Sequence, residues 1–206
     1  MSPKAATAKA NTTRERLLEA AHSLIWANSY AQVSVEDICR AAGVQKGSFY
    51  HFFPGKAALA AAALEEHWAQ ACPMVDEIFA SHTSAPEQLK ALCAAILRDQ
   101  QESFERTGKV CGCPYATLSS ELRGQDDALF VLSREISARF LGYYQQLLAN
   151  AAQAGLIPAE GVHARAEEMQ VYVLGAMFHA RMTNTLHSVG APLEAALMRI
   201  AGFEAV

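Results

Sequence analysis

Apolar residues recur along most of this chain at spacings of three and four, as one face of an α-helix requires, and runs of β-branched residues are almost absent. The first apolar stripe passes through Leu17 and Leu24. Thr12 and Glu15 precede it at the spacing of a capping box, in which each side chain accepts a hydrogen bond from the other residue's backbone N–H. The pattern predicts a first helix over about 12–28.

Two further helices are predicted close behind the first, and both are short. Ser34 and Asp37 have the spacing of a second capping box, and apolar residues at helical spacing follow as far as Ala42. Gly43 can take the positive φ that commonly ends a helix. The pattern then resumes and predicts a third helix over 45–52.

The remaining chain keeps the helical pattern, interrupted by Gly and Pro. After a turn at Pro54-Gly55, a helix is expected over 56–80, disturbed at Pro73. The later helices are expected over 86–106, 114–122, 126–154, 163–187 and 192–203. The protein is therefore predicted to be all-α, and its expected parts are a flexible arm over 1–11, a three-helix head over 12–55 and a helical bundle over 56–206.

Composition narrows the class of protein. A length of 206 residues corresponds to one large domain or two small ones, and 51% apolar with 18% charged residues indicates a globular chain. The longest apolar runs fall well short of the ~18 residues that a membrane span requires. No apolar core follows Lys4 and Lys9, so a signal peptide is not expected. We therefore expect a cytoplasmic protein with its five cysteines reduced.

Charge is distributed unevenly along the chain. The net charge is −4, which by itself does not favour binding to nucleic acid. Residues 1–60, however, carry seven Lys or Arg against four acidic residues, whereas the rest carries ten against seventeen. A basic head on an acidic body indicates that only the head meets a polyanion.

The two short helices over 34–52, joined by a Gly-Val turn, have the arrangement of a helix-turn-helix, whose second helix can enter the DNA major groove. In the second of them, Phe49, Phe52 and Phe53 are expected to anchor the helix to the core of the head. Gly47 would let the backbone come close to DNA. The surface side carries hydrogen-bonding groups of moderate length: Gln45, Lys46, Ser48, Tyr50 and His51.

The segment 34–59 closely resembles the DNA-binding domain of the tetracycline-repressor (TetR/AcrR) family of transcriptional regulators. The resemblance is carried by the cap Ser34, Ala42-Gly43-Val44, Gly47, Tyr50, His51-Phe52 and Lys56. Two departures are visible: Cys39 stands where Ala is usual, and Gly55-Lys56-Ala57 lacks the polar cap and acid common around that Lys. Neither departure touches the expected DNA surface.

The resemblance implies two groups of DNA contacts. It implies phosphate contacts, which set the register on DNA, by Ser34, Tyr50, His51 and Lys56. It implies base contacts in the groove by Gln45, Lys46 and Ser48. From the residues alone, plainer roles stay open, because Tyr50 could be a packed aromatic residue, Lys56 a solvated charge at a helix start, and Lys46 a surface lysine without a partner.

Both late long helices carry more apolar surface than one buried face needs. The 126–154 helix has one stripe from Leu129 to Leu147 and part of another from Leu141 to Leu148. In the 163–187 helix, Gly175 leaves part of the face thin enough for close helix approach. A helix that is apolar on two sides must bury both. In the resembled family the last two long helices pair with their copies in a four-helix bundle, which implies a homodimer; the alternative is that both stripes are internal core.

The segment 108–122 resembles a branch of that family in which a Gly-Cys-Pro/Leu…Leu-Ser/Ala-x-Glu-Leu stretch opens a short helix beside the ligand pocket. Gly112-Cys113 matches it, and some members of the branch respond to reactive small molecules through a Cys here. A helix N-terminus would stabilise a Cys113 thiolate, but a cysteine is often a small buried apolar group. No Lys follows Lys109, so a Lys partner from a later helix is excluded. Cys111 and Cys113 lack the second ligand pair of a structural zinc site, so neither a metal nor a cofactor is predicted.

A mostly apolar pocket for a small molecule is predicted within 60–187. Its expected lining residues lie on helices that flank the likely cavity: Trp68, Phe104, Cys113, Tyr115, Tyr144, Tyr172, Met177 and His179. For His179, a satisfied histidine in the core is the alternative to a polar group in the pocket.

These observations predict a repressor, not an enzyme, that a small-molecule effector releases from a palindromic operator in double-stranded DNA. The alternatives are an enzyme that uses Cys113 with His179, for which no third catalytic member can be named, a redox or electrophile sensor with no reversible ligand, and a DNA-binding protein with no effector.

Overall fold

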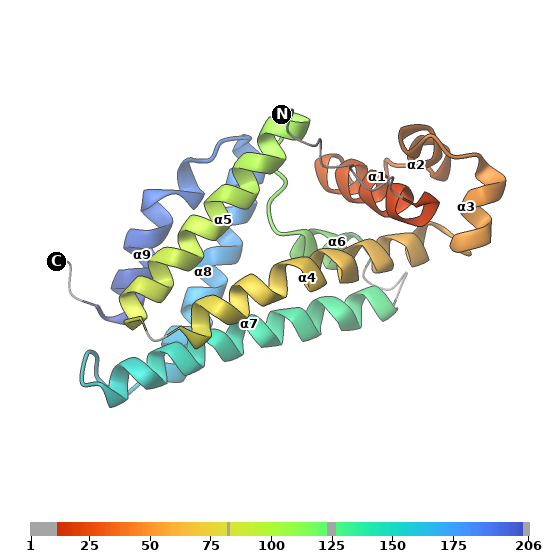
Figure 1. Cartoon of the computed structure of the whole chain (residues 1–206). Coiled ribbons are helices and arrows are strands. Elements are labelled where there is room, and N and C mark those ends of the chain that lie inside the picture. The colour runs from red at the N-terminus through yellow and green to blue at the C-terminus, as the bar shows by residue number, and fades with distance from the viewer. Residues whose placement is uncertain (1–11, 82, 123–126, 204–206) are drawn as a thin grey trace, which may run out of the picture. The chain divides into compact units, whose positions relative to one another are not determined.

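The structure, a computed structural model, describes residues 12–81, 83–122 and 127–203, and every regular element in these ranges is helical (Figure 1). This confirms the all-α prediction. The predicted arm over 1–11 lies outside the described residues. The elements are α1 (Thr13–Ala27), α2 (Val35–Ala42), α3 (Lys46–Phe52), α4 (Lys56–Ala80), α5 (Ala85–Thr107), α6 (Pro114–Leu122), α7 (Asp127–Gln153), α8 (Val162–Thr183), a short 3-10 helix η1 (His187–Val189) and α9 (Ala191–Ala201).

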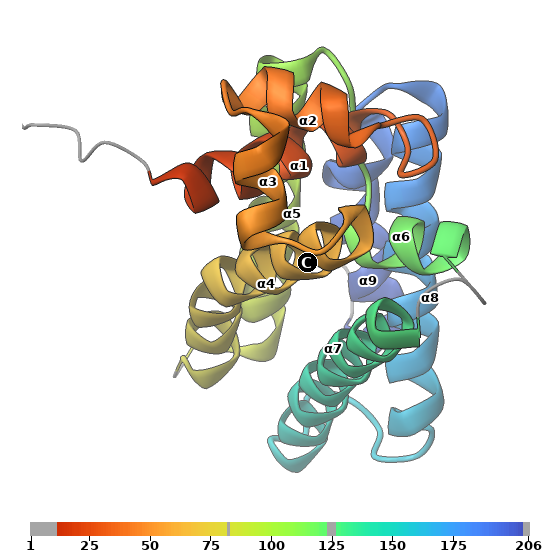
Figure 2. The same ribbon diagram turned by 90° about the vertical axis from the view of Figure 1, so that its right-hand side faces the viewer.

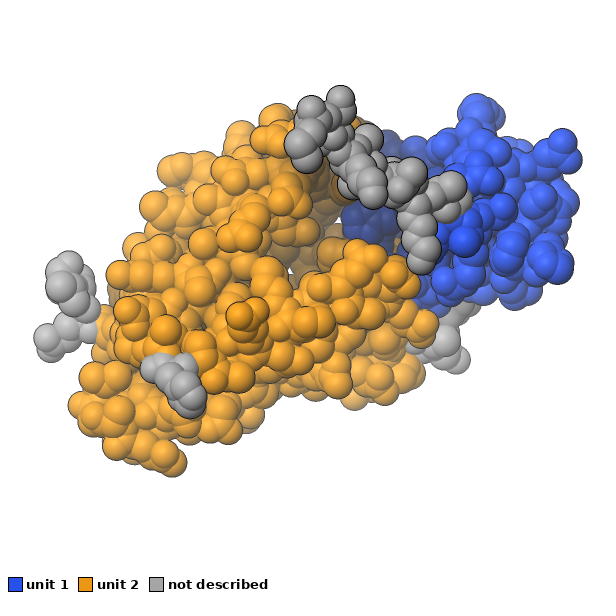
Figure 3. All heavy atoms as spheres, viewed as in Figure 1, with its two compact units in different colours: residues 1–63 blue, residues 64–206 orange. Residues whose placement is uncertain are grey.

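The chain divides into two compact units, unit 1 over Met1–Ala63 and unit 2 over Leu64–Val206 (Figure 3). The division falls within α4, whose first two turns therefore belong to unit 1. Leu59 and Ala60 in these turns are buried. The boundary was predicted at 55/56, at the start of this helix, whereas the structure places it at 63/64. The sequence marks the turn at Pro54-Gly55, but a helix that passes from one unit into the next gives no sequence signal where the units meet.

The starts of α1 and α2 are fixed by local side chains, as the pattern predicts. The Thr12 backbone N–H donates to Glu15 Oε2 over 2.7 Å, and the Glu15 N–H donates back to Thr12 Oγ1 over 3.2 Å. Ser34 and Asp37 exchange the same two bonds, each over 3.1 Å. Gly43 ends α2 with φ of +62°, a conformation that costs glycine little. Both capping boxes and this helix end are confirmed.

Of the three aromatic residues predicted to anchor α3 in the core of unit 1, one does not lie in the core. Phe49 is fully buried and Phe53 nearly so, but Phe52 is 41% exposed. The reason is that α3 ends at Phe52, and the chain turns into an extended conformation at Phe53. That turn brings the Phe53 ring to within 6.1 Å of the Phe49 ring, whereas Phe52 stays at the surface beside His51.

In unit 2, α8 packs between α7 and α9, and α9 also packs on α5 (Figures 1 and 2). The shared core contains Tyr144 and Leu147 of α7, Met169 of α8 and Leu193 of α9, all of them buried. Among the described residues no helix is long and apolar enough to span a membrane.

Two expectations for the helices of unit 2 are wrong, one for a disturbance within α4 and one for the end of α8. The helix α4 continues through Pro73, which lies on its exposed side, so the expected disturbance is not seen. The helix α8 ends at Thr183, not near His187, because Asn184 takes a left-handed conformation with φ of 51°. A tertiary contact favours that end: the Asn184 side chain accepts from the Val110 N–H over 2.9 Å and donates to the Gly108 carbonyl over 3.2 Å.

Candidate functional site

The helix-turn-helix of unit 1 presents most of the predicted DNA contacts to the solvent. α2 and α3 follow one another across the Gly43-Val44 turn (Figure 2). Tyr50 is 52% exposed, so it is not an interior aromatic residue. The other predicted residues at this surface are also exposed: Ser34, Gln45, Lys46, Gly47, Ser48 and His51. Their contact with DNA remains a prediction.

Lys46 has an acidic partner on the neighbouring helix. Its ammonium group forms a hydrogen-bonded ion pair with Glu36 of α2, and this bond lowers the pKa of the Glu36 carboxyl. Both side chains are more than half exposed. An exposed ion pair contributes little to stability and is screened by salt. Lys46 can therefore exchange Glu36 for a phosphate or a base without harming the fold.

Lys56 differs from the other predicted phosphate contacts because its ammonium group binds backbone carbonyls within unit 1. Its Nζ donates to the Tyr30 carbonyl over 2.7 Å and to the Val33 carbonyl over 2.9 Å. The same atom lies 4.0 Å from the centre of the Tyr30 ring, within range of a cation–π interaction. These contacts hold the loop between α1 and α2 against the start of α4.

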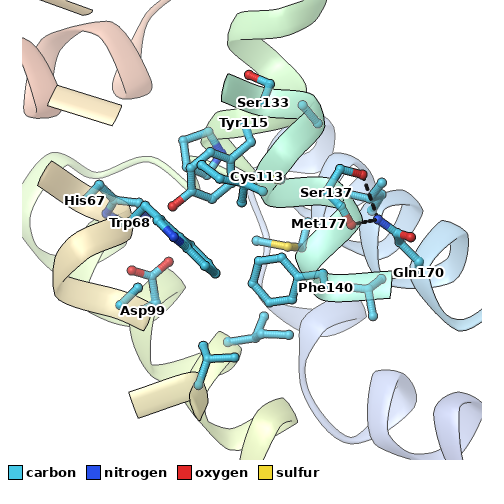
Figure 4. Close-up of a pocket in the computed structure, with 18 of the residues that line it drawn as sticks. His67, Trp68, Asp99, Cys113, Tyr115, Ser133, Ser137, Phe140, Gln170 and Met177 are labelled. Carbon is cyan, nitrogen blue, oxygen red and sulfur yellow. Dashed lines mark hydrogen bonds between the residues drawn. The ribbon is translucent and has the colours of Figure 1, made fainter. Parts of the chain in front are cut away.

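Unit 2 contains a partly open cavity of about 340 Å³ that is bounded by α4, α5, α6, α7 and α8 (Figure 4). Its size is within the range of small-molecule sites, and its walls are mainly apolar and aromatic. The apolar side chains include Trp68, Leu92, Ile96, Ile136, Phe140 and Val173. The polar side chains include His67, Asp99, Tyr115, Ser133, Ser137 and Gln170.

The structure brings five of the eight predicted pocket residues to this cavity: Trp68, Cys113, Tyr115, Tyr144 and Met177. Phe104, Tyr172 and His179 do not line it, and all three are exposed. On α8 the faces separate by helical geometry, because Val173 and Met177 are one turn apart on the cavity side while Tyr172 and His179 share a different face. For His179, both the pocket and the core interpretation are wrong.

Sequence reasoning missed other lining residues, above all His67, Asp99, Ser133 and Phe140. Phe140 belongs to the apolar stripe of α7, so its burial could be predicted, but not which cavity it faces. His67 precedes the predicted Trp68, which is the one local signal for it. Nothing in the sequence pattern separates Asp99 from the exposed acids of α5.

The Gly-Cys segment before α6 is clamped between α5 and α8. Gln100 accepts from the Gly112 N–H over 2.8 Å and donates to the Gly112 carbonyl over 3.2 Å. Arg181 of α8 donates to the Cys111 carbonyl over 2.7 Å. Ser103 donates to the buried Cys111 sulfur over 2.9 Å. These bonds fix the position at which Cys113 enters the cavity.

The Cys113 thiol is not activated by its place before α6. Burial raises the pKa of Cys113, and this effect exceeds the opposing one of hydrogen bonds from the Ala116 and Tyr115 backbone. A thiolate is the reactive form, so the protonated thiol is a weak nucleophile here. In the part of the chain that the structure describes, no group of three or more His, Cys, Asp or Glu residues is arranged to hold a metal ion.

The close approach of α8 to Gly112 predicts that Gly112 tolerates a side chain less well than Gly108 does. Gly112 and Gly108 both have φ of +70°, but a Cβ on Gly112 would lie 3.1 Å from the Met177 carbonyl oxygen and 3.2 Å from Arg181 Cβ, whereas one on Gly108 would meet open space. Gly108→Ala is expected to lower the unfolding free energy by about 1–2 kcal/mol. Gly112→Ala is expected to cost roughly 1–3 kcal/mol more.

Urea unfolding of the two variants would measure this difference. Equal losses would mean that α8 does not approach Gly112 as closely as the structure has it.

Comparison with known proteins matches the first unit to a family. Residues 17–63 match the family described as bacterial regulatory proteins, tetR family. The chain is 30% identical over 118 residues to the transcriptional regulator AcuR of Cereibacter sphaeroides, covering 57% of this chain and 52% of AcuR. It is 29% identical over 110 residues to the HTH-type transcriptional repressor NemR of Escherichia coli, covering 53% and 54%. The chain thus matches about half the length of these curated relatives.

Solved structures match the fold over nearly the whole chain. A TetR-family regulator from Agrobacterium tumefaciens has a TM-score of 0.81 at 23% identity, covering 91% of this chain and 96% of that one. The regulatory protein TetR from Rhodobacter sphaeroides has a TM-score of 0.75 at 25% identity, with coverages of 93% and 98%. The reduced form of Escherichia coli NemR has a TM-score of 0.74 at 22% identity, with coverages of 95% and 100%. The arrangement of a helix-turn-helix followed by a helical bundle is therefore that of these regulators.

Proposed function

We propose that this chain, whose residues 17–63 match the tetR family of bacterial regulatory proteins, is a dimeric repressor that a small molecule releases from operator DNA. The observation that carries the proposal is the α2–α3 pair, which presents Gln45, Ser48 and Tyr50 at the surface of a domain matched to that family. A helix of this kind reads base edges in the major groove, and the groups around it bind phosphate.

An exposed apolar stripe on α8 supports a dimer. Val171 is 69% exposed, and Phe178 and Met182 are each 66% exposed. They are spaced by seven and four residues and lie on one face of the helix, with the exposed Gly175 between them. Contiguous exposed apolar surface of this kind marks an interaction site. We propose a second copy of the chain as its occupant, with α7 alongside.

A two-fold dimer with two reading heads would bind a palindromic operator. Its half-sites would lie about 34–36 Å apart, or a multiple of that distance, so that both recognition helices enter the major groove.

Control by a ligand is proposed for the cavity of unit 2. Its residues His67, Trp68 and Val75 lie on α4, the same continuous helix that begins in unit 1. A ligand that prefers one position of α4 would shift the protein toward the state with that position, whereas equal affinity for both states would change nothing. The protonated Cys113 thiol favours reversible binding over covalent capture of the ligand.

Selection from random duplex DNA with the purified full chain would test the function. A single enriched palindrome is expected, with affinity that falls steeply as salt rises, because phosphate contacts release counterions. No enrichment above unselected DNA would overturn the proposal.

Two variants would separate the roles on α3. Gln45→Ala is expected to relax preference at one base position in each half-site by about tenfold, since a good side-chain–base pair contributes ~1–3 kcal/mol of discrimination. Tyr50→Phe is expected to weaken all sequences alike by a few-fold, because a phosphate contact carries no base information. Anisotropy titrations on matched and mismatched duplexes would measure both. A change of base preference in Tyr50→Phe, with none in Gln45→Ala, would reverse the assignment.

A further inference from the structure

Two hydroxyl groups in the cavity wall are buried without a hydrogen-bond partner among the described residues. They are Tyr115 Oη at the start of α6 and Ser133 Oγ on α7. Nearly all buried hydroxyls in proteins are paired, since an unpaired one loses its bonds to water without replacement. An unpaired hydroxyl in the wall of a ligand-sized cavity indicates a polar atom on the ligand.

The surroundings of Tyr115 determine what kind of atom it can bind. The Trp68 ring lies 6.1 Å from the Tyr115 ring and the His67 ring 5.8 Å from it, and Asp99 lies at the same end of the cavity (Figure 4). Burial lowers the pKa of His67, so its ring is neutral near pH 7, and burial raises the pKa of Tyr115, which keeps its proton. Tyr115 can therefore donate a hydrogen bond, and the formal charge beside it is negative.

This environment disfavours an anionic ligand. A carboxylate or phenolate near Tyr115 would lose its bonds to water among apolar side chains, and the neutral His67 supplies no positive charge to compensate. The cavity wall includes Arg134, but its guanidinium lies over Phe130, 5.9 Å from the ring centre, and its side chain is exposed.

An organic cation is disfavoured for a different reason. Aromatic faces attract cations, but the Trp68 ring already has the Arg139 guanidinium 5.7 Å from its centre. Asp99, which could pair with a cation, accepts a hydrogen bond from Gln100 over 2.8 Å and is exposed to solvent. An exposed carboxylate gains little from an ion pair.

We infer that the effector is a neutral, mainly aromatic molecule with a carbonyl oxygen that accepts a hydrogen bond from Tyr115 Oη. Its apolar body would pack against Trp68, Phe140 and Met177, which line the same cavity (Figure 4). The inference rests on the proposed function only in taking this cavity as the effector site.

Four probes that share one ring system would test it by calorimetry on the full chain. The probe 2-acetylnaphthalene carries a carbonyl, 2-ethylnaphthalene has the same shape without it, 2-naphthoate is an anion, and 2-naphthylmethylammonium is a cation. The acetyl probe is expected to bind about tenfold more tightly than the ethyl probe, as a buried hydrogen bond provides. Neither charged probe is expected to bind more tightly than the ethyl probe.

Substitution of Tyr115 isolates the bond. Tyr115→Phe is expected to remove the tenfold preference for the acetyl probe and to leave affinity for the ethyl probe unchanged. Because the hydroxyl has no partner among the described residues, the variant is expected to keep the thermal midpoint of the parent protein. The matched control Tyr172→Phe, outside the cavity on α8, is expected to change none of the four affinities.

The inference fails if the acetyl and ethyl probes bind alike, or if the acetyl preference survives in Tyr115→Phe. If either charged probe binds more tightly than the acetyl probe, the cavity binds ligands of that charge and the inference of a neutral effector is wrong. The inference is also wrong if none of the four probes binds. Operator selection uses no probe, so a failure here is distinguishable from a failure of the proposed repressor function.

Discussion

Phe178→Glu is expected to convert the protein into monomers and to weaken operator binding by about a hundredfold or more. Phe178 lies in the exposed stripe of α8 proposed as the dimer surface, where a charge would be buried against apolar side chains of the second copy. Two linked heads bind far more tightly than one, because the second head binds at a high effective concentration. Sedimentation equilibrium would measure the mass, and fluorescence anisotropy the affinity for the selected duplex.

Leu156→Glu is the matched control for this prediction. Leu156 is a similarly exposed apolar residue, at 51%, but it lies in the connection between α7 and α8, outside the stripe. The control is expected to stay dimeric and to keep its operator affinity. A Phe178→Glu protein that remains dimeric at micromolar concentration would place the interface elsewhere. Ala176, in the same helix, would be a poor choice because it is packed in the core of unit 2.

Local features were largely predictable from sequence because local contacts decide them. The capping boxes at Thr12 and Ser34 need only residues three positions apart, and Gly43 needs only its own backbone freedom. The end of α8 was not predictable in this way. Asn184 stops the helix through bonds to Gly108 and Val110, which are far away in sequence.

The cavity was predictable in composition but not in detail. Trp68, Tyr115 and Met177 could be identified as apolar or aromatic residues on helices that flank a core. The choice between Tyr172 and Val173, neighbours on α8, depends on how that helix is rotated against α7. Helical periodicity defines faces relative to one another, and only packing determines which face meets a cavity. Whether Tyr115 Oη has a hydrogen-bond partner likewise depends on the packing of the helices around it.

Lys56 illustrates how a family resemblance can assign a role that internal contacts oppose. The resemblance implies a phosphate contact, whereas in unit 1 the ammonium is bound by the Tyr30 and Val33 carbonyls. We therefore propose that Lys56 stabilises the head and that Lys46, whose pair with Glu36 is exposed, is free to meet DNA.

Lys56→Met is expected to lower the unfolding free energy of the protein by about 3–6 kcal/mol. The substitution keeps an unbranched apolar stem but removes two charge-assisted hydrogen bonds to partly buried carbonyls, each contributing ~1.5–3 kcal/mol. Urea unfolding followed by the fluorescence of Trp26, which is buried in unit 1, would measure the loss.

Lys46→Met is the complementary variant, because it is expected to weaken operator binding without lowering the unfolding free energy. Its side chain is exposed, so the unfolding free energy is expected to stay close to that of the parent protein. We propose that Lys46 binds a phosphate instead of the base edge that the resemblance implies. Its operator affinity should then fall, and the slope of log affinity against log salt should decrease by about one, as loss of one phosphate contact predicts. Lys56→Met, measured at a temperature where it is folded, should keep the parent slope. A Lys56→Met protein of unchanged stability with a slope reduced by one would instead make Lys56 a phosphate contact, since a lysine that only holds the loop between α1 and α2 releases no counterion when DNA binds.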